Sequence, residues 1–184
     1  MADLHLYMIL LGCRPKGRFT EQHDIFFGVS RSLSELVPGI KASWPEAKGA
    51  VHIDAWRKIT QVAGHAITVI ERSGPMKTNV QKLFFINLGG YKPGEFDEFH
   101  YKAVVVAANK AEAIQQARQT AFYKHTGFKG ATSHVDDKYG IDVDDAFEIK
   151  DILNDSRYHL VITPHEADED AMYLGYLKLD KIKE

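Results

Sequence analysis

The chain has 184 residues, of which 45% are hydrophobic and 26% are charged, which is the composition of an ordinary globular protein. The formal net charge of -2 excludes a strongly basic nucleic-acid-binding protein and an acidic disordered tail as descriptions of the whole chain. A single cysteine, Cys13, excludes an intrachain disulfide framework and a zinc site made only of cysteines.

The apolar stretch at the start of the chain, Leu4–Leu11, follows Asp3 and has no basic leader, which argues against a signal peptide. No run in the sequence approaches the ~20 apolar residues that a membrane span needs. We therefore expect a cytoplasmic protein without a membrane partner.

Four strands are expected in the first part of the chain. Each is a short run of apolar or β-branched residues bounded by glycine or polar residues. The turn between the last two is expected at Gly64. The four runs are Leu4–Leu11, Asp24–Ser30, His52–Lys58 and Ala66–Glu71.

A helix is expected between the second and third of these strands. Ser32 and Glu35 have the spacing of a capping box, in which the hydroxyl and the carboxylate satisfy the first backbone amides. Pro38 lacks a backbone donor, so we expect this helix to end or kink near Val37.

The second part of the chain resembles the first. A shift of 77 positions aligns Leu6–Val37 with Leu83–Ile114, and ten of the 32 positions are identical. A helix is expected from Asn109, which has Glu112 at the capping-box offset, to about Tyr123. Strands are expected at Lys82–Leu88, Tyr101–Ala107, Ala146–Ile152, Tyr158–Thr163 and Tyr173–Leu179.

A second match, between Lys48–Asp54 and Lys129–Asp136, supports an internal duplication. We therefore predict an α+β protein made of two tandem ββαββ units of the β-grasp or roll type, with one helix packed on each mixed or antiparallel sheet. The expected segments are repeat units at residues 1–72 and 82–164, a linker at 73–81, and an acidic loop and strand at 165–184.

Several strings are similar to those of a known bacterial family. The most specific is Leu88-Gly89-Gly90-Tyr91-Lys92-Pro93-Gly94-Glu95-Phe96, followed by Glu98 and His100. Together with Leu10–Arg14, Glu21–Asp24, His52–Trp56 and Tyr173–Leu177, it resembles a family of domains of unknown function (number fifteen forty-three). The resemblance covers most of the chain and implies no particular activity.

Both halves contain a Glu-x-His motif and a later His-x-Asp motif. In an extended chain, residues i and i+2 share a face, so each motif aims its two side chains together. Two imidazoles and two carboxylates suffice to bind Zn²⁺, Mn²⁺ or Fe²⁺, and would equally serve acid–base chemistry. The candidate ligand or metal residues are Glu21, His23, His52 and Asp54, with Glu98, His100, His134 and Asp136 in the second half.

These residues also have a structural interpretation, in which each carboxylate ties down a loop and each histidine caps or fills the end of a strand. A separate basic loop with Arg14, Lys16 and Arg18 is a candidate anion site, although a solvated loop explains it as well. The acidic run from Asp142 to Glu148 lacks the glycine and the ligand spacing of an EF-hand.

The sequence favours a ligand- or partner-binding module. The alternative is a metal-dependent enzyme that uses the paired Glu-x-His and His-x-Asp groups, and it requires those groups to converge in space. Nucleic acid is not an expected partner, because few cations lie among the aromatic residues. The sequence leaves a homo-oligomer open.

Overall fold

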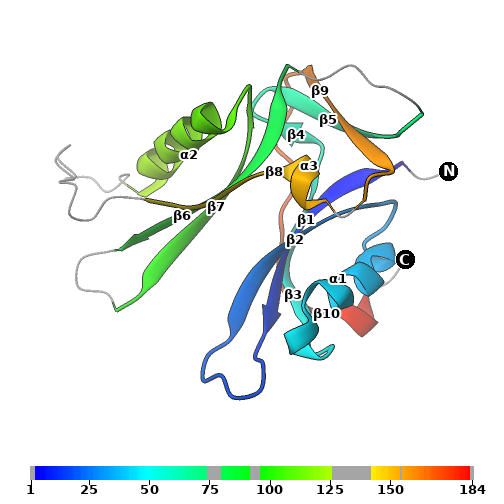
Figure 1. The fold of residues 1–184 in the computed structure, drawn as a ribbon, viewed down its shortest axis with the longest axis vertical. Coiled ribbons are helices and arrows are strands. Elements are labelled where there is room, and N and C mark those ends of the chain that lie inside the picture. Colours follow the sequence, from blue (N-terminus) through cyan, green and yellow to red (C-terminus); the bar gives the residue numbers. More distant parts are fainter. Residues whose placement is uncertain (1–2, 74–79, 92–95, 126–141, 154, 183–184) are drawn as a thin grey trace. The chain divides into compact units, whose positions relative to one another are not determined.

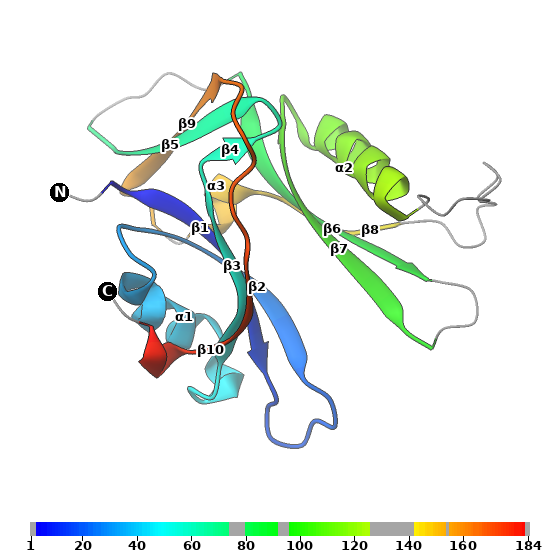
Figure 2. The ribbon, with the colours of Figure 1, turned by 180° about the vertical axis from the view of Figure 1, so that it is seen from behind.

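The computed structural model describes residues 3–73, 80–91, 96–125, 142–153 and 155–182. The chain forms two compact units, drawn in Figures 1 and 2. Unit 1 consists of Met1–Lys77 and Leu153–Glu184, and unit 2 of Thr78–Ile152. The predicted division into the segments 1–72, 73–81, 82–164 and 165–184 stays a prediction.

Unit 1 contains a four-stranded antiparallel sheet in the order β10-β3-β1-β2. Strands close in sequence form three of its members, and the fourth comes from the end of the chain and runs along β3 (Figure 2). The strands are β1 (His5–Cys13), β2 (Gln22–Ser30), β3 (His52–Ile59) and β10 (Tyr173–Lys178).

One face of this sheet carries the core of unit 1. Tyr7, Ile9 and Leu11 alternate along β1 and are at most 2% exposed. They cluster with Ile40 of α1 (Val37–Ser43), and each such buried side chain contributes roughly 1.5–3 kcal/mol of hydrophobic stabilisation. Short 3₁₀ segments complete this layer: η1 (Ser34–Leu36), η2 (Pro45–Ala47) and η4 (Leu179–Lys181). Gly12 of β1 lies on the opposite face of the sheet, away from this core.

A smaller antiparallel sheet in unit 1 has the order β4-β5-β9. Its strands are β4 (Gln61–Val62), β5 (His65–Glu71) and β9 (Tyr158–Pro164). The predicted turn at Gly64 is confirmed, because Gly64 joins β4 to β5 with a φ of +76°, a conformation that favours glycine.

Unit 2 is a three-stranded antiparallel sheet in the order β7-β6-β8 with one long helix on a face. Ala113 and Ala117 of the helix are fully buried against Phe84 and Ile86 of the central strand. The elements are β6 (Lys82–Tyr91), β7 (Glu98–Ala107), α2 (Lys110–His125), β8 (Asp142–Glu148) and α3 (Ile149–Ile152) (Figure 1).

The predicted fold class is wrong, both as α+β and as two tandem ββαββ repeats with one helix each. The residues that the structure describes are mostly antiparallel β-sheet, arranged in three sheets with few helices. β5 pairs with β9 and not with β3, and the predicted strand Ala146–Ile152 is the end of β8 followed by α3. Local apolar runs indicate where strands lie. Which strands form a sheet together depends on pairing between strands that are remote in sequence.

The start of α1 also differs from the prediction. The α-helix begins at Val37, where a break was expected, and Pro38 lies in its first turn, where a missing N–H costs no hydrogen bond. Glu35 Oε2 accepts from the Arg31 amide at 2.9 Å instead of the Ser32 amide. In α2 the expected cap is confirmed: Asn109 Oδ1 accepts from the Glu112 amide at 3.0 Å.

The Asp170 carboxylate fastens the segment that leads into β10. It accepts hydrogen bonds from the Thr60 amide (2.7 Å), the Thr60 hydroxyl (2.5 Å) and the Gln61 amide (2.9 Å). Asp170→Asn replaces one acceptor oxygen by a donor, so we expect a loss of about 1–3 kcal/mol in the free energy of unfolding. Denaturant unfolding measures this loss, and hydrogen exchange should show faster opening of β10. The exposed Asp168→Asn is the matched control, and an equal loss there would contradict the assignment.

Candidate metal centre

The polar residues predicted in the first half gather around Gly12 of β1. Gly12 is paired with His23 of β2 on one side and with His52 of β3 on the other. Directly paired residues project to the same face of a sheet, so the two imidazoles flank a position that has no side chain. Glu21 comes immediately before β2, two residues from His23.

Asp54 joins these residues through a β-bulge. Leu10 pairs with Ala55, but the next residue, Leu11, pairs with Ile53, so Asp54 is an extra residue in β3. A bulge bends its strand and redirects a side chain, and bulges are frequent beside functional sites. The bulge therefore brings the Asp54 carboxylate to the histidines that flank Gly12.

The two carboxylates lie between the two imidazoles. His52 Nε2 is 3.0 Å from Glu21 Oε1 and 3.2 Å from Asp54 Oδ1. His23 Nε2 is 3.2 Å from Asp54 Oδ2 and 3.8 Å from Glu21 Oε2. One potential ligand atom from each of Glu21, His52 and Asp54 lies within 4.8 Å of the other two. The four predicted residues of the first half therefore meet; we call them the Gly12 cluster.

The close packing of the Gly12 cluster depends on the missing side chain at Gly12. A Cβ there would overlap Asp54 Oδ2 and would lie 2.5 Å from His52 Nε2. Real Cβ atoms are not found so close to other heavy atoms, so any other residue would displace the Asp54 and His52 side chains. The backbone of β1 is the floor of the site.

The Asp54 carboxylate has an unusual environment. Its Oδ2 atom is buried and accepts no hydrogen bond, although His23 Nε2 lies at 3.2 Å. The contact therefore brings the imidazole nitrogen close to this oxygen without forming a hydrogen bond. A buried carboxylate oxygen without a donor is costly, and a cation beside it would remove the cost.

Exposure divides the cluster into an inner and an outer part. The side chains of His52 and Asp54 are 11% and 23% exposed, whereas those of Glu21 and His23 are each 44% exposed. Neither carboxylate accepts a backbone amide among the described residues, which argues against the interpretation that they tie down loops. The cluster is anchored on β3 and open to solvent on the side of β2.

Tyr176 of β10 forms one wall of the cluster. Its ring centroid is 4.3 Å from that of His52, with the planes inclined by 44°. Two residues of β10, Gly175 and Tyr176, lie opposite the single bulged residue Asp54 of β3, and Gly175 has a φ of +122°. This ring contact limits rotation of the His52 imidazole. Tyr176 is not predicted as a site residue, because no chemical motif contains it.

Unit 2 has a related cluster around Gly89 of β6, which pairs with His100. Asp144 is the extra residue of a bulge in β8, and its Oδ2 lies 3.2 Å from His100 Nε2. Glu98, His100 and Asp144 each place a potential ligand atom within 4.8 Å of the other two. We call these three residues the Gly89 cluster.

Different partners were predicted for Glu98 and His100. The predicted His134 and Asp136 lie outside the described residues. Asp144 was missed, because the Lys-Gly-Ala string common to both halves suggested an alignment that ends at Asp136. The Asp-x-Asp spacing of Asp142 and Asp144 was the available signal, but it was considered only as a calcium loop.

The basic residues Arg14, Lys16 and Arg18 are exposed in the loop between β1 and β2. Their loop is closed by a turn in which the Arg18 amide donates to the Pro15 carbonyl at 3.1 Å. They do not belong to either cluster, and an anion site there stays a prediction.

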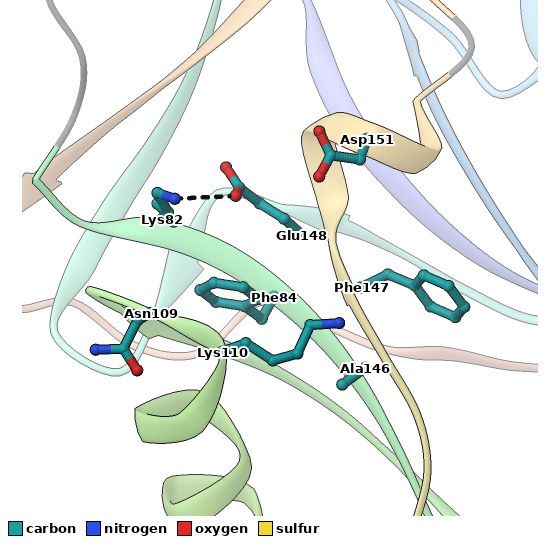
Figure 3. A pocket seen from close by; sticks show the side chains of 8 residues that line it. All are labelled: Lys82, Phe84, Asn109, Lys110, Ala146, Phe147, Glu148 and Asp151. Carbon is teal, nitrogen blue, oxygen red and sulfur yellow. Dashed lines mark ion pairs between the residues drawn. The ribbon is translucent and has the colours of Figure 1, made fainter.

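A shallow cavity of about 240 Å³ in unit 2 is drawn in Figure 3. Its acidic and basic groups are balanced: Lys82 Nζ lies 3.2 Å from Glu148 Oε2, and Lys110 and Asp151 are also present. It contains neither histidine nor cysteine, and its charged groups differ from those of both clusters. The lining residues are Lys82, Phe84, Asn109, Lys110, Ala146, Phe147, Glu148 and Asp151.

Fold and cluster together define a mainly antiparallel β protein with a histidine–carboxylate site on its larger sheet. Residues 18–69 match a family described as Domain of Unknown Function (DUF1543), which confirms the resemblance over this segment; the strings Leu88–Phe96 and Tyr173–Leu177 lie outside the match. The matched segment contains all four residues of the Gly12 cluster.

A crystal structure of a protein Il1583 from Idiomarina loihiensis is similar, with a TM-score of 0.67 and 21% identity over 96% of this chain and 99% of that chain. At this identity the likeness shows the fold alone. No curated protein matches the chain. Among the described residues, no helix is both long and apolar enough to cross a membrane.

Gly12→Ala tests whether the close approach at Gly12 holds the cluster together. We expect the folded structure to persist while Asp54 and His52 move apart, because the added methyl group occupies their place. The side-chain ¹⁵N shifts of His52 should change by NMR. Gly39→Ala, a substitution in α1 that is remote from the cluster, should leave these shifts unchanged, and an unaltered His52 spectrum in Gly12→Ala would contradict the assignment.

Cys13 is expected to be inert in the folded protein. It is fully buried, and burial, with a smaller contribution from the charge of Glu21, raises the pKa of its thiol. Thiolate is the reactive form, so Ellman's reagent should modify Cys13 only after the protein is unfolded. Rapid modification of the native protein at pH 8 would show that the thiol is accessible.

Proposed function

We propose that the protein binds a divalent transition-metal ion at the Gly12 cluster. Glu21, His52 and Asp54 are the ligands, and His23 lies at the margin as a fourth group. The observation that carries the proposal is the convergence of two imidazoles and two carboxylates on the sheet face above Gly12.

The separations support this proposal. Ligand atoms bound at about 2.0–2.1 Å to a tetrahedral ion are about 3.3 Å apart. The four histidine–carboxylate separations are 3.0, 3.2, 3.2 and 3.8 Å. Three of these four separations are close to the spacing that a tetrahedral ion needs.

Electrostatics favours a cation at the same place. Glu21 and Asp54 place two carboxylates around one imidazole, and like charges this close repel unless a positive charge lies between them. A protonated histidine supplies one such charge, and a divalent ion supplies two. The buried, unpaired Oδ2 of Asp54 favours the ion.

The mixed donor set narrows the choice of metal. Imidazole and carboxylate together suit Zn²⁺, Mn²⁺ and Fe²⁺, whereas Mg²⁺ and Ca²⁺ prefer oxygen alone. In the described part of the chain no cysteine belongs to the cluster, since Cys13 lies in the core on the other face of the sheet. We therefore expect Zn²⁺ to bind more tightly than Mn²⁺.

A metal-dependent enzyme is the second candidate function. Catalytic metal sites have three protein ligands and keep a position for water, whereas structural zinc sites have four. Glu21, His52 and Asp54 are three such ligands, and the exposed His23 lies beside them as a potential proton acceptor. This arrangement favours hydrolytic chemistry over a binding module without a metal.

Metal binding can be tested on the full chain after chelation and dialysis. We expect Zn²⁺ to raise the unfolding free energy, by about 2.7 kcal/mol at a free concentration 100 times the dissociation constant. Asp54→Asn and His52→Ala should abolish tight binding, as measured by calorimetric titration. The exposed His165→Ala in unit 1 is the matched control. The proposal is wrong if His52→Ala and Asp54→Asn bind Zn²⁺ as tightly as the unaltered chain.

The enzymatic alternative needs a further measurement. The metal-loaded protein would hydrolyse a simple ester such as p-nitrophenyl acetate, and His23→Gln would lower the rate while the metal stays bound. Equal hydrolysis by the metal-free chain would exclude this role for the Gly12 cluster.

A further inference from the structure

We infer that unit 2 holds a second metal site, at the Gly89 cluster, with a harder and weaker donor set than that of unit 1. The inference rests on the proposed function for its chemistry, but its residues, Glu98, His100 and Asp144, are separate. A chain with both sites would bind two ions with unequal affinity.

The Gly89 cluster is constructed in the same way as the Gly12 cluster. His100 lies directly opposite Gly89, as His23 lies opposite Gly12. The ladder between β6 and β8 shifts at Asn87 and Leu88, and this shift makes Asp144 the extra residue, as Asp54 is in β3. In both units, therefore, a glycine is paired with a histidine on one neighbouring strand, and an aspartate is the extra residue of a β-bulge on the other.

At the Gly89 cluster the side chain of Asp144 also lies very close to the backbone of the glycine. A Cβ at Gly89 would lie 2.5 Å from Asp144 Oδ2 and 2.8 Å from its Oδ1. Both oxygens of this carboxylate therefore rest on the backbone of β6, beside His100 Nε2. An alanine at position 89 could not coexist with this position of Asp144.

An unpaired acceptor lies near the Gly89 cluster. Asn87 precedes Gly89 by two residues on β6, so its side chain leaves the same face of the sheet. Its Nδ2 donates to Asp145 Oδ2 at 3.4 Å, whereas its Oδ1 is buried and has no hydrogen-bond partner. An amide carbonyl is a typical ligand of hard cations, and the corresponding residue in β1 is the apolar Leu10.

The donor set distinguishes this site from that of unit 1. In β3 the residue paired with the floor glycine is His52, whereas in β8 the residue paired with Gly89 is Asp142. With His23 counted as the fourth group, the Gly12 cluster has two imidazoles and two carboxylates, whereas the described ligands of unit 2 are one imidazole and two carboxylates. Fewer nitrogen ligands reduce the preference for Zn²⁺ over Mn²⁺.

Exposure and charge predict the lower affinity. The side chains of His100 and Asp144 are 39% and 32% exposed, more than those of His52 and Asp54. Lys102 pairs with Asn87 on this side of the sheet, where β2 has Ile25 opposite Leu10. The positive charge of a lysine on the same face of the sheet and better solvation both weaken the binding of a cation.

The experiment is a titration of the full chain with Zn²⁺ and, separately, with Mn²⁺. Calorimetry measures the binding of both ions, and electron paramagnetic resonance also measures the binding of Mn²⁺. We expect two bound ions in the unaltered chain. Asp144→Asn should remove only the weaker ion, and His52→Ala only the tighter one. The ratio of Zn²⁺ to Mn²⁺ affinity should be smaller for the ion that survives in His52→Ala.

Asp151→Asn, an exposed aspartate of unit 2, is the matched control and should keep both ions. The inference fails alone if the chain binds one ion and Asp144→Asn does not change it. It also fails if the second ion survives in both Asp144→Asn and Glu98→Gln. Unchanged tight binding in His52→Ala would instead overturn the proposed function, so the two failures are distinguishable.

Discussion

Two neighbouring strands can bring charged side chains together above a third strand only if that strand leaves the space open. Gly12 of β1 has no side chain, and the Asp54 and His52 side chains occupy the volume that a Cβ at this position would fill. The bulge in β3 is the second requirement, since it adds the residue whose carboxylate reaches that volume. The short distances between the side chains of the Gly12 cluster depend on these two features of the backbone.

Much of the candidate site could be predicted from the sequence because its motifs are local. Glu21 and His23 belong to one extended segment, and His52 and Asp54 belong to another, so each pair shares a face whatever the fold. That the two pairs meet depends on β2 and β3 both flanking β1, which no motif states. Asp144 is harder to predict, because the string that suggests an alignment ends at Asp136, and the Asp-x-Asp spacing of Asp142 and Asp144 does not state which strand they pair with.

The strands themselves were predictable from apolar runs, and β1, β2, β6 and β7 lie close to their expected positions. Their assembly was not predictable, because it is decided by pairs that are distant in the chain. β10 joins β3, and β9 joins β5, across an interval that contains the whole of unit 2. The start of α1 also differs from its prediction. Proline breaks a helix in its interior, but Pro38 lies in the first turn, where proline is well tolerated.

The pairing of β5 with β9 has a consequence for how the chain could be shortened. Glu71 and Tyr158 are direct partners at one end of this ladder, so the two points between which unit 2 is inserted are adjacent in space. A tight two-residue turn, such as Asn-Gly, is the natural connection between antiparallel partners. Excision of the intervening residues with such a turn would turn β5 and β9 into a simple hairpin and leave every strand of the larger sheet in one shorter polypeptide.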